Sequence, residues 1–321
     1  MGRNHTRIYS ELENVEFSAV ADASAELTRK IANQYRVRAY TDYREMLSHE
    51  NLQAVSVAVP TRLHREVAEA ALNAGVAVLV EKPIAATIED ARAMIAMAQK
   101  NKLLLMVGHV ERWNPAVVAL KSRLQSGALG KIFQIHAQRL GPFPARVRDV
   151  GVVLDLATHD LDVMRFLTES NATRVYAETA RRIHTDHEDL LSGIVAFASG
   201  TVGVLDINWL TPTKVRVLSV TGERGMFAVN YLTQELWFYR NDMYSSDEWD
   251  SLRTLRGVSE GDMIKIRIDT REPLKVELQA FLACVEQNAP APVNGEDGLY
   301  ALQLAQALVE SGQTHQVIEI K

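Results

Sequence analysis

The sequence has little of what marks secreted, membrane or nucleic-acid-binding proteins. Its single cysteine, Cys284, excludes an intrachain disulfide and lies in a helical pattern typical of a buried structural thiol. No apolar run approaches the roughly 20 residues of a membrane span, and the N-terminus has no apolar core of a signal peptide. No Lys/Arg cluster forms the basic stripe that binds phosphate backbones. We therefore expect a cytoplasmic protein without membrane or nucleic-acid partners.

What is present is the composition of an ordinary globular protein. The 321 residues are 47% hydrophobic and 23% charged, with a formal net charge of -5. This length allows two domains and a sizeable core.

The N-terminal third alternates short apolar runs with amphipathic stretches. Residues 15–22, 54–60, 76–83 and 103–109 are rich in Val, Ala and Leu and do not alternate with polar residues. Such runs are typical of strands that are buried on both faces of a parallel sheet. With helical patterns between them, they predict a doubly wound sheet whose ligand crevice lies at the carboxyl ends of the strands.

Beyond Asn114 the pattern changes. Apolar and polar residues alternate in long segments separated by turns, which predicts an antiparallel sheet with one face in water. Two helical patterns, 273–288 and 296–312, close the chain. The predicted fold is α/β: a Rossmann domain at 1–114 and an α/β domain with a large, mainly antiparallel open sheet at 115–321.

The first helix and the acid after the next strand suggest a dinucleotide fingerprint. Asp22 lies 20 residues after Gly2, the spacing between the third glycine of a Rossmann loop and its ribose-binding acid. The first strand and first two glycines would then precede Met1. We expect a start about ten residues late, with weak cofactor binding and poor stability. Asp22 favours NAD over NADP, because a carboxylate repels a 2′-phosphate; alternatively it only caps the following turn.

Three segments carry a family resemblance: VAVLVEKPIA, GHVERWNPAV and GVVLDLATHDLDVMRFL. Together they resemble the glucose-fructose oxidoreductase, inositol dehydrogenase and MocA family over nearly the whole chain. The resemblance implies a Rossmann domain followed by a domain whose open sheet serves in oligomer contacts. It also implies NAD as cofactor, a small sugar substrate and a homodimer or homotetramer.

Three residues are the candidate catalytic groups. Lys82 follows a predicted strand, and Asp155 and His159 are four residues apart, so on a helix they share one face. The family pattern places its catalytic lysine, aspartate and histidine at these positions. We predict that His159 is the general base, that Lys82 hydrogen-bonds the reacting oxygen and that Asp155 positions His159 or a substrate hydroxyl. Lys82 and His159 could exchange roles, and the alternative is that Asp155 and His159 only cap or line a helix.

Further positions follow from the fingerprint and the resemblance. The expected cofactor contacts are Gly2, Asn4, His5, Asp22, Pro60, Thr61, His64, Glu81, Lys82, Arg112 and Trp113. The expected substrate contacts are Lys82, Asn114, Arg146, Asp155 and His159. For Trp113 a place in the core is an equal alternative.

The segment RLGPFPARVRDVG is the clue to the substrate. Its arginines Arg139, Arg146 and Arg148 suit phosphate or carboxylate groups, although loop arginines are usually solvated. With GHVERWNPAV it resembles the family branch that oxidises the 3-hydroxyl of UDP-N-acetylglucosamine or its uronic acid. Alternatives are an inositol or free-sugar dehydrogenase, an NAD-dependent glycosidase and a non-catalytic NAD-binding regulator. The cluster HTDHED at 184–189 is interpreted as a solvated loop, and no metal is expected.

Overall fold

The computed structural model describes residues 1–144, 150–183, 186–241 and 260–320. They form two compact units, Met1–Val110 with Glu272–Leu302, and Glu111–Arg271 with Gln303–Lys321. The predicted division into 1–114 and 115–321 differs because the chain returns to the first unit near its end. There, the Val107 N–H donates to the Val293 carbonyl at 3.0 Å.

The first unit contains the predicted parallel strands, in two ladders. One pairs β1 with β2, and the other has the order β3-β4-β5. The elements are α1 (Gly2–Glu11), β1 (Ala19–Ala21), α2 (Ala25–Tyr35), β2 (Arg38–Tyr40), α3 (Tyr43–His49), β3 (Ala54–Val57), η1 (Thr61–Leu63), α4 (His64–Asn73), β4 (Ala77–Glu81), α5 (Ile88–Asn101), β5 (Leu105–Gly108), α9 (Pro273–Gln287) and the first part of α10 (Gly295–Thr314). All five residues of β4 are buried, as its unbroken apolar pattern predicts.

Side-chain caps fix where several helices begin. Ser24 accepts from the Leu27 N–H at the start of α2, and Thr87 accepts from the Asp90 N–H at the start of α5. Each cap satisfies a backbone donor that the first helical turn leaves unpaired. The helix boundaries therefore follow from polar residues directly before apolar periodic runs.

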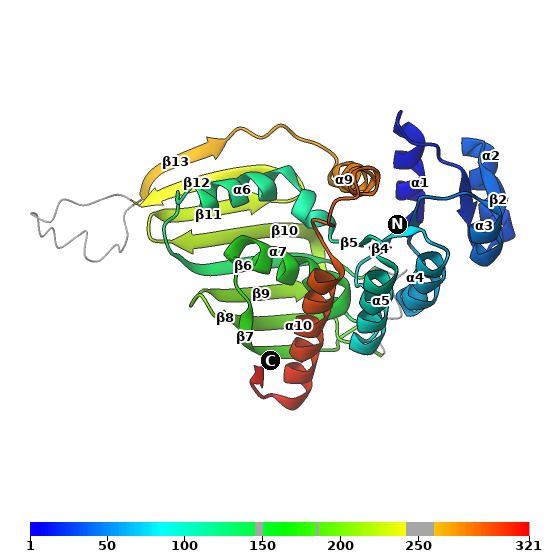
Figure 1. Cartoon of the computed structure of the whole chain (residues 1–321). Helices are drawn as coiled ribbons and strands as arrows, with labels where there is room; N and C mark the ends of the chain where they lie inside the picture. Colours follow the sequence, from blue (N-terminus) through cyan, green and yellow to red (C-terminus); the bar gives the residue numbers. More distant parts are fainter. Residues whose placement is uncertain (145–149, 184–185, 242–259, 321) are drawn as a thin grey trace, which may run out of the picture. The chain divides into compact units, whose positions relative to one another are not determined.

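The second unit is built on a nine-stranded sheet (Figure 1), in the order β13-β12-β11-β10-β6-β9-β8-β7-β14. Only β6 and β9 pair in parallel, so the predicted, mainly antiparallel sheet is confirmed. Its strands are β6 (Ile132–Pro142), β7 (Ala172–Ala180), β8 (Leu190–Phe197), β9 (Val202–Asn208), β10 (Leu210–Gly222), β11 (Gly225–Asn230), β12 (Glu235–Asn241), β13 (Glu260–Ile266) and β14 (Ile318–Glu319).

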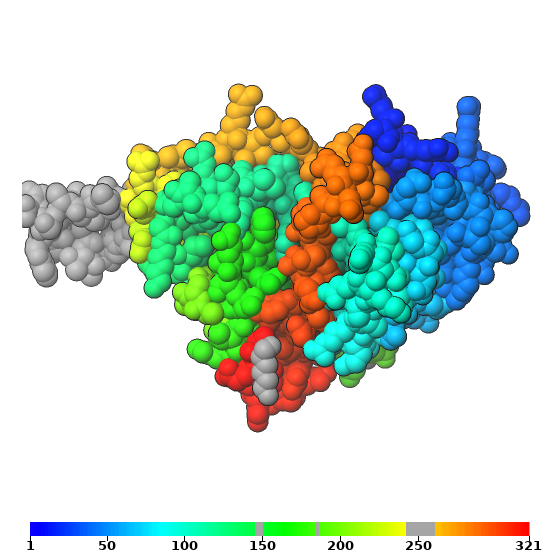
Figure 2. Space-filling view, viewed as in Figure 1, coloured from blue at the N-terminus to red at the C-terminus, as the bar shows by residue number. Residues whose placement is uncertain are grey.

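Helices cover one face of this sheet. They are η2 (Val110–Trp113), α6 (Pro115–Gln125), η3 (Val153–Ala157), α7 (Thr158–Thr168) and the second part of α10. Atoms of α6 and α7 overlie the strands in the space-filling view (Figure 2). The buried residues Ile135, Ala137 and Arg139 alternate along β6 and point to this face. Within the described residues, none of the helices combines the length and the apolar character of a membrane span.

Candidate active site

Lys82 lies directly after β4 in the first unit, on a tightly held turn. The Lys82–Pro83 peptide bond is cis, and the Lys82 side chain is half-buried. The ring of His64 lies against this turn, with its Nδ1 3.0 Å from the Pro83 carbonyl and its Nε2 3.0 Å from the Val59 carbonyl. His64 is 1% exposed, and burial lowers its pKa. This ring therefore links the segments after β3 and β4 instead of facing a ligand.

The residue before Lys82 forms a buried contact with the first helix. His5 Nε2 lies 2.7 Å from Glu81 Oε1, and the two residues are 3% and 6% exposed. Both were predicted as cofactor contacts, and the structure brings them together. The pair anchors the end of β4 to α1, and so fixes the backbone from which Lys82 extends.

The first unit has groups that fit a dinucleotide. No side chain caps the first turn of α1 at Gly2, so its amino-terminal N–H groups can face a pyrophosphate. Asp22 is exposed at the end of β1, where its Oδ1 accepts from the Ser24 N–H at 2.8 Å. Asp22 thus does cap the turn, as in the alternative interpretation, but exposure leaves its carboxylate open to a ribose. Asn4 and Pro60 are also exposed, and Thr61 is half-buried.

In the second unit, Asp155 and His159 lie on one continuous helical run. It begins with the five-residue π-helix η3 and passes directly into α7. Both side chains are half-buried, whereas Thr158 and Asp160 beside them are buried. A π turn holds more residues than an α turn, so groups four and five apart are neighbours; such turns recur at functional sites. The run therefore presents Asp155 and His159 as partly accessible groups of one helix.

Glu188 holds the amino-terminal end of this helical run. Its Oε1 accepts from the Val153 N–H at 3.2 Å, and its carbonyl accepts from the Val152 N–H at 2.9 Å. Asp189, fully buried, accepts from the N–H groups of Arg182 and Ile183. Sequence reasoning treated the 184–189 cluster as a solvated loop, and so missed that two of its acids organise backbone.

A buried ionic cluster fixes the start of α7 to the sheet. The Arg139 guanidinium donates to both Asp160 oxygens, at 2.7 and 3.0 Å, and to Glu111 Oε1 at 2.9 Å. Burial alone would lower the pKa of Arg139, but the charges of Asp160 and Glu111 outweigh it and the pKa is raised. Arg139, one of the suggested anion-binding arginines, is therefore occupied within the protein. Through Asp160, the first turn of α7, which contains His159, is tied to β6.

Two predicted ligand contacts near residue 112 also have protein partners. Arg112 forms a two-point ion pair with Asp162 at 2.7 and 2.6 Å. Asn114 is 2% exposed; its side chain accepts from the Ala116 N–H and donates to the Tyr231 carbonyl. Asn114 is thus the cap of α6, a role that its position before Pro115 could have indicated. Trp113 is half-buried, and its Nε1 has no partner in the described part of the chain.

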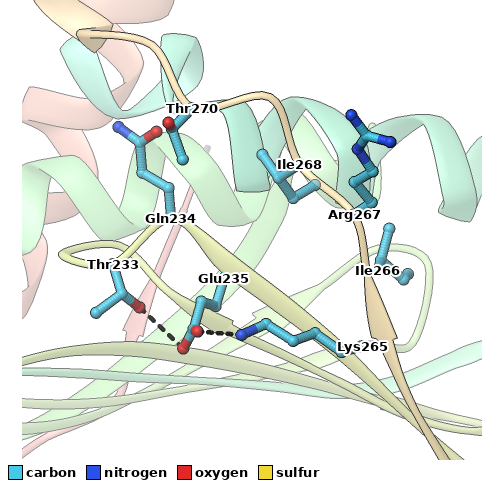
Figure 3. A pocket seen from close by; sticks show the side chains of 8 residues that line it. All are labelled: Thr233, Gln234, Glu235, Lys265, Ile266, Arg267, Ile268 and Thr270. Atoms are coloured by element: carbon cyan, nitrogen blue, oxygen red, sulfur yellow. Dashed lines mark hydrogen bonds and ion pairs between the residues drawn. The ribbon is translucent and has the colours of Figure 1, made fainter.

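The remaining candidates are two arginines, a metal site and a surface hollow. Arg146 and Arg148 lie outside the described residues. In the part of the chain that the structure describes, no group of three or more His, Cys, Asp or Glu could hold a metal. A surface hollow near the start of β12 is lined by residues 233–235, 265–268 and 270 (Figure 3), and an ion pair between Lys265 and Glu235 lies across it. It has none of the predicted site residues.

A unit with a parallel sheet, followed by a unit with a large, mainly antiparallel sheet, is typical of two-domain NAD-binding oxidoreductases. Residues 1–109 match the oxidoreductase family with an NAD-binding Rossmann fold, and residues 117–228 match the GFO/IDH/MocA C-terminal domain. The chain belongs to this glucose-fructose oxidoreductase, inositol dehydrogenase and MocA family, and is an oxidoreductase of the kind that acts on CH–OH groups.

Its relatives include sugar and sugar-nucleotide dehydrogenases. UDP-N-acetylglucosamine 3-dehydrogenase of Acidithiobacillus ferrooxidans is 30% identical over 305 residues, which are 95% of this chain and 92% of that protein. D-apiose dehydrogenase of Paraburkholderia graminis is 28% identical, over 99% of this chain and 87% of that protein. A solved structure of the Acidithiobacillus enzyme superposes with a TM-score of 0.83 at 28% identity, covering 98% of this chain and 94% of the other.

Proposed function

We propose that this protein oxidises a secondary hydroxyl of a sugar or sugar nucleotide, with C3 of UDP-N-acetylglucosamine or its uronic acid as the first candidate. The observation that carries the proposal is the pair of half-buried groups, Asp155 and His159, on a helix that buried ion pairs hold in place. The 30% identity to a UDP-N-acetylglucosamine 3-dehydrogenase supports the choice of substrate.

In this proposal each catalytic group has one task. Bound NAD supplies the hydride acceptor. His159 removes the hydroxyl proton, and Lys82 donates a hydrogen bond to the oxygen as it gains alkoxide character. Asp155 orients His159 or a neighbouring hydroxyl of the sugar. Its position on the π turn supports this role, because groups four apart are neighbours there.

We propose NAD rather than NADP as the cofactor. The exposed carboxylate of Asp22 would accept hydrogen bonds from a ribose 2′-hydroxyl and repel a 2′-phosphate. Asp22→Ala should therefore reduce the preference for NAD over NADP by about tenfold or more, measured as the ratio of the two Kd values. An unchanged ratio would contradict the assignment.

The deciding experiment is a turnover assay on the wild-type chain and two variants. UDP-sugars, inositols and free hexoses are tested with NAD by the absorbance of the reduced cofactor. His159→Asn should abolish turnover and leave NAD binding intact, because His159 lies in the second unit, whereas the first turn of α1 and Asp22, the groups proposed for the pyrophosphate and the ribose, lie in the first. Arg174→Met, on an exposed position of β7, is the control that should keep full activity. Near-full turnover of His159→Asn would refute the role of this histidine.

We also propose a homodimer or homotetramer that is formed through the uncovered face of the nine-stranded sheet. Cα pairing places Val202, Ile194 and Tyr239 on this face, and Met263 lies opposite Tyr239. These four side chains are between 37% and 59% exposed and form two apolar groups, one on β8 and β9 and one on β12 and β13. Ile194→Glu with Tyr239→Glu should give monomers in light scattering, and an unchanged mass would contradict the proposed face.

A further inference from the structure

Two arginines lie side by side on the helix-covered face of the sheet, and only one is neutralised. Arg216 of β10 is the Cα partner of Arg139 of β6, so both side chains point to the same face. Arg139 uses its guanidinium on Asp160 and Glu111. Arg216 has no carboxylate within ion-pair distance among the described residues.

The guanidinium of Arg216 keeps three of its five N–H donors available among the described residues. Its Nη1 donates to the carbonyls of Leu140 and Val215 at 2.5 and 2.7 Å, which fixes the orientation of the plane. Its Nη2 and Nε have no hydrogen-bond partner in the ranges that the structure describes. The terminal nitrogens lie 3.9 Å from where a Cβ at Gly141 would be, so residue 141 provides no side chain to cover them. The Arg216 side chain is half-buried, so its remaining N–H groups are held in place and are only partly solvated.

The charge of a proposed catalytic residue acts on Arg216. Burial and the like charge of Arg139 lower the pKa of Arg216 to about 10, so the guanidinium remains cationic at pH 7. Asp155 is among the acids whose charges act on it. A cation that is fixed near Asp155 would offset the repulsion between this carboxylate and an anionic substrate group.

We propose that Arg216 is a substrate-binding residue that takes an oxyanion, a carboxylate or a phosphate, of the sugar oxidised at Asp155 and His159. The inference rests on the proposed function and extends it to substrate selectivity. A guanidinium with its Nη2 and Nε open can donate hydrogen bonds to the two oxygens of one such group at once. The sequence did not single out Arg216, because it lies in an ordinary strand pattern and its open donors arise from the partners that Arg139 has taken.

A purely structural role predicts something different. Glu111 and Asp160 together carry one more charge than Arg139 neutralises, and Arg216 could serve only to balance them. In that case its loss would lower stability and would affect all substrates alike. In the proposed role, its loss weakens only the ligands that carry an oxyanion.

The test is calorimetric titration of the full chain and of Arg216→Met with three sugars. UDP-N-acetylglucosamine carries phosphates, glucuronate carries a carboxylate, and glucose carries neither. Arg216→Met should weaken one or both anionic ligands by about tenfold or more and should change glucose by less than about twofold; the affected ligand identifies the oxyanion. Equal weakening of all three, or of none, would overturn the proposal.

A second variant keeps the test valid if Arg216→Met folds poorly. Arg216→Lys retains the charge but not the fork, so it should fold and still show a selective loss for the anionic sugar. Wild-type affinity of Arg216→Lys for that sugar would overturn the proposal. Because titration needs no turnover, oxyanion binding by Arg216 can be measured whether or not the protein oxidises the sugar. A wild-type chain that reduces no NAD with any sugar refutes the proposed function, while Arg216-dependent oxyanion binding would persist.

Discussion

Replacing Arg139 with Met should both destabilise the second unit and slow catalysis. The Arg139 side chain is 4% exposed, and its partners Asp160 and Glu111 are 1% and 16% exposed. Methionine fills similar volume but leaves two carboxylates without their cation, and breaking a buried pair in this way costs about 3–5 kcal/mol. For a unit of this size, that loss corresponds to a fall in Tm of roughly 10 °C.

The catalytic effect follows from the position of Asp160 next to His159. Once Asp160 is released, the first turn of α7 loses its anchor on β6, so kcat should fall while NAD affinity stays unchanged. The assays are thermal unfolding, followed by circular dichroism, and steady-state kinetics with a saturating sugar. Arg174→Met removes an exposed arginine of the same sheet and should change stability by less than about 0.5 kcal/mol. If Arg139→Met behaves like this control, the cluster does not hold the helix as we describe.

Three more predictions concern single side chains. Because burial lowers the pKa of His64, the unfolded chain takes up its proton first; stability should fall as pH drops below about 6.5, and His64→Gln should flatten this slope in urea titrations at pH 5 to 8. Asn114→Ala removes the cap of α6 and should cost about 1–2 kcal/mol by chemical denaturation; Asn114→Ser, which keeps an accepting oxygen without a charge, should cost less. Glu188→Ala frees the Val153 N–H and should lower kcat severalfold with little change in NAD affinity, whereas Glu188→Gln should retain most activity; equal rates for the two variants would contradict the capping role.

The sequence predicted the elements with strong hydrophobic patterns and missed those without them. Strands β3, β4 and β5 lie within a few residues of their predicted ranges, because burial selects Val, Ala and Leu there, and helices α2, α4 and α5 lie between the predicted strands. Strand β2 was missed because Arg38 and Ala39 are exposed and give no apolar run. Strand β13 was missed because Lys265 and the charged residues before it mask its alternation.

The site residues also divide into those whose positions the sequence predicts and those whose positions it does not. The positions of Asp155 and His159 on one helix could be predicted from their spacing, but the π turn could not, because no local spacing marks it and the Glu188 that accepts from its first residue, Val153, lies 35 residues away. The buried partners of Arg112 and Arg139 lie 50 and 21 residues away in the sequence, and no local pattern identifies which acid pairs with which arginine. Arg216 emerges only when the register of β10 against β6 is known.

The π turn also makes the geometry of the proposed catalytic pair sensitive to chain length. Deleting one residue from η3 would convert it to α-helix and leave α7 helical, yet it would change where Asp155 lies around the helix axis relative to His159. The angle between these two groups can therefore be reset without replacing either side chain.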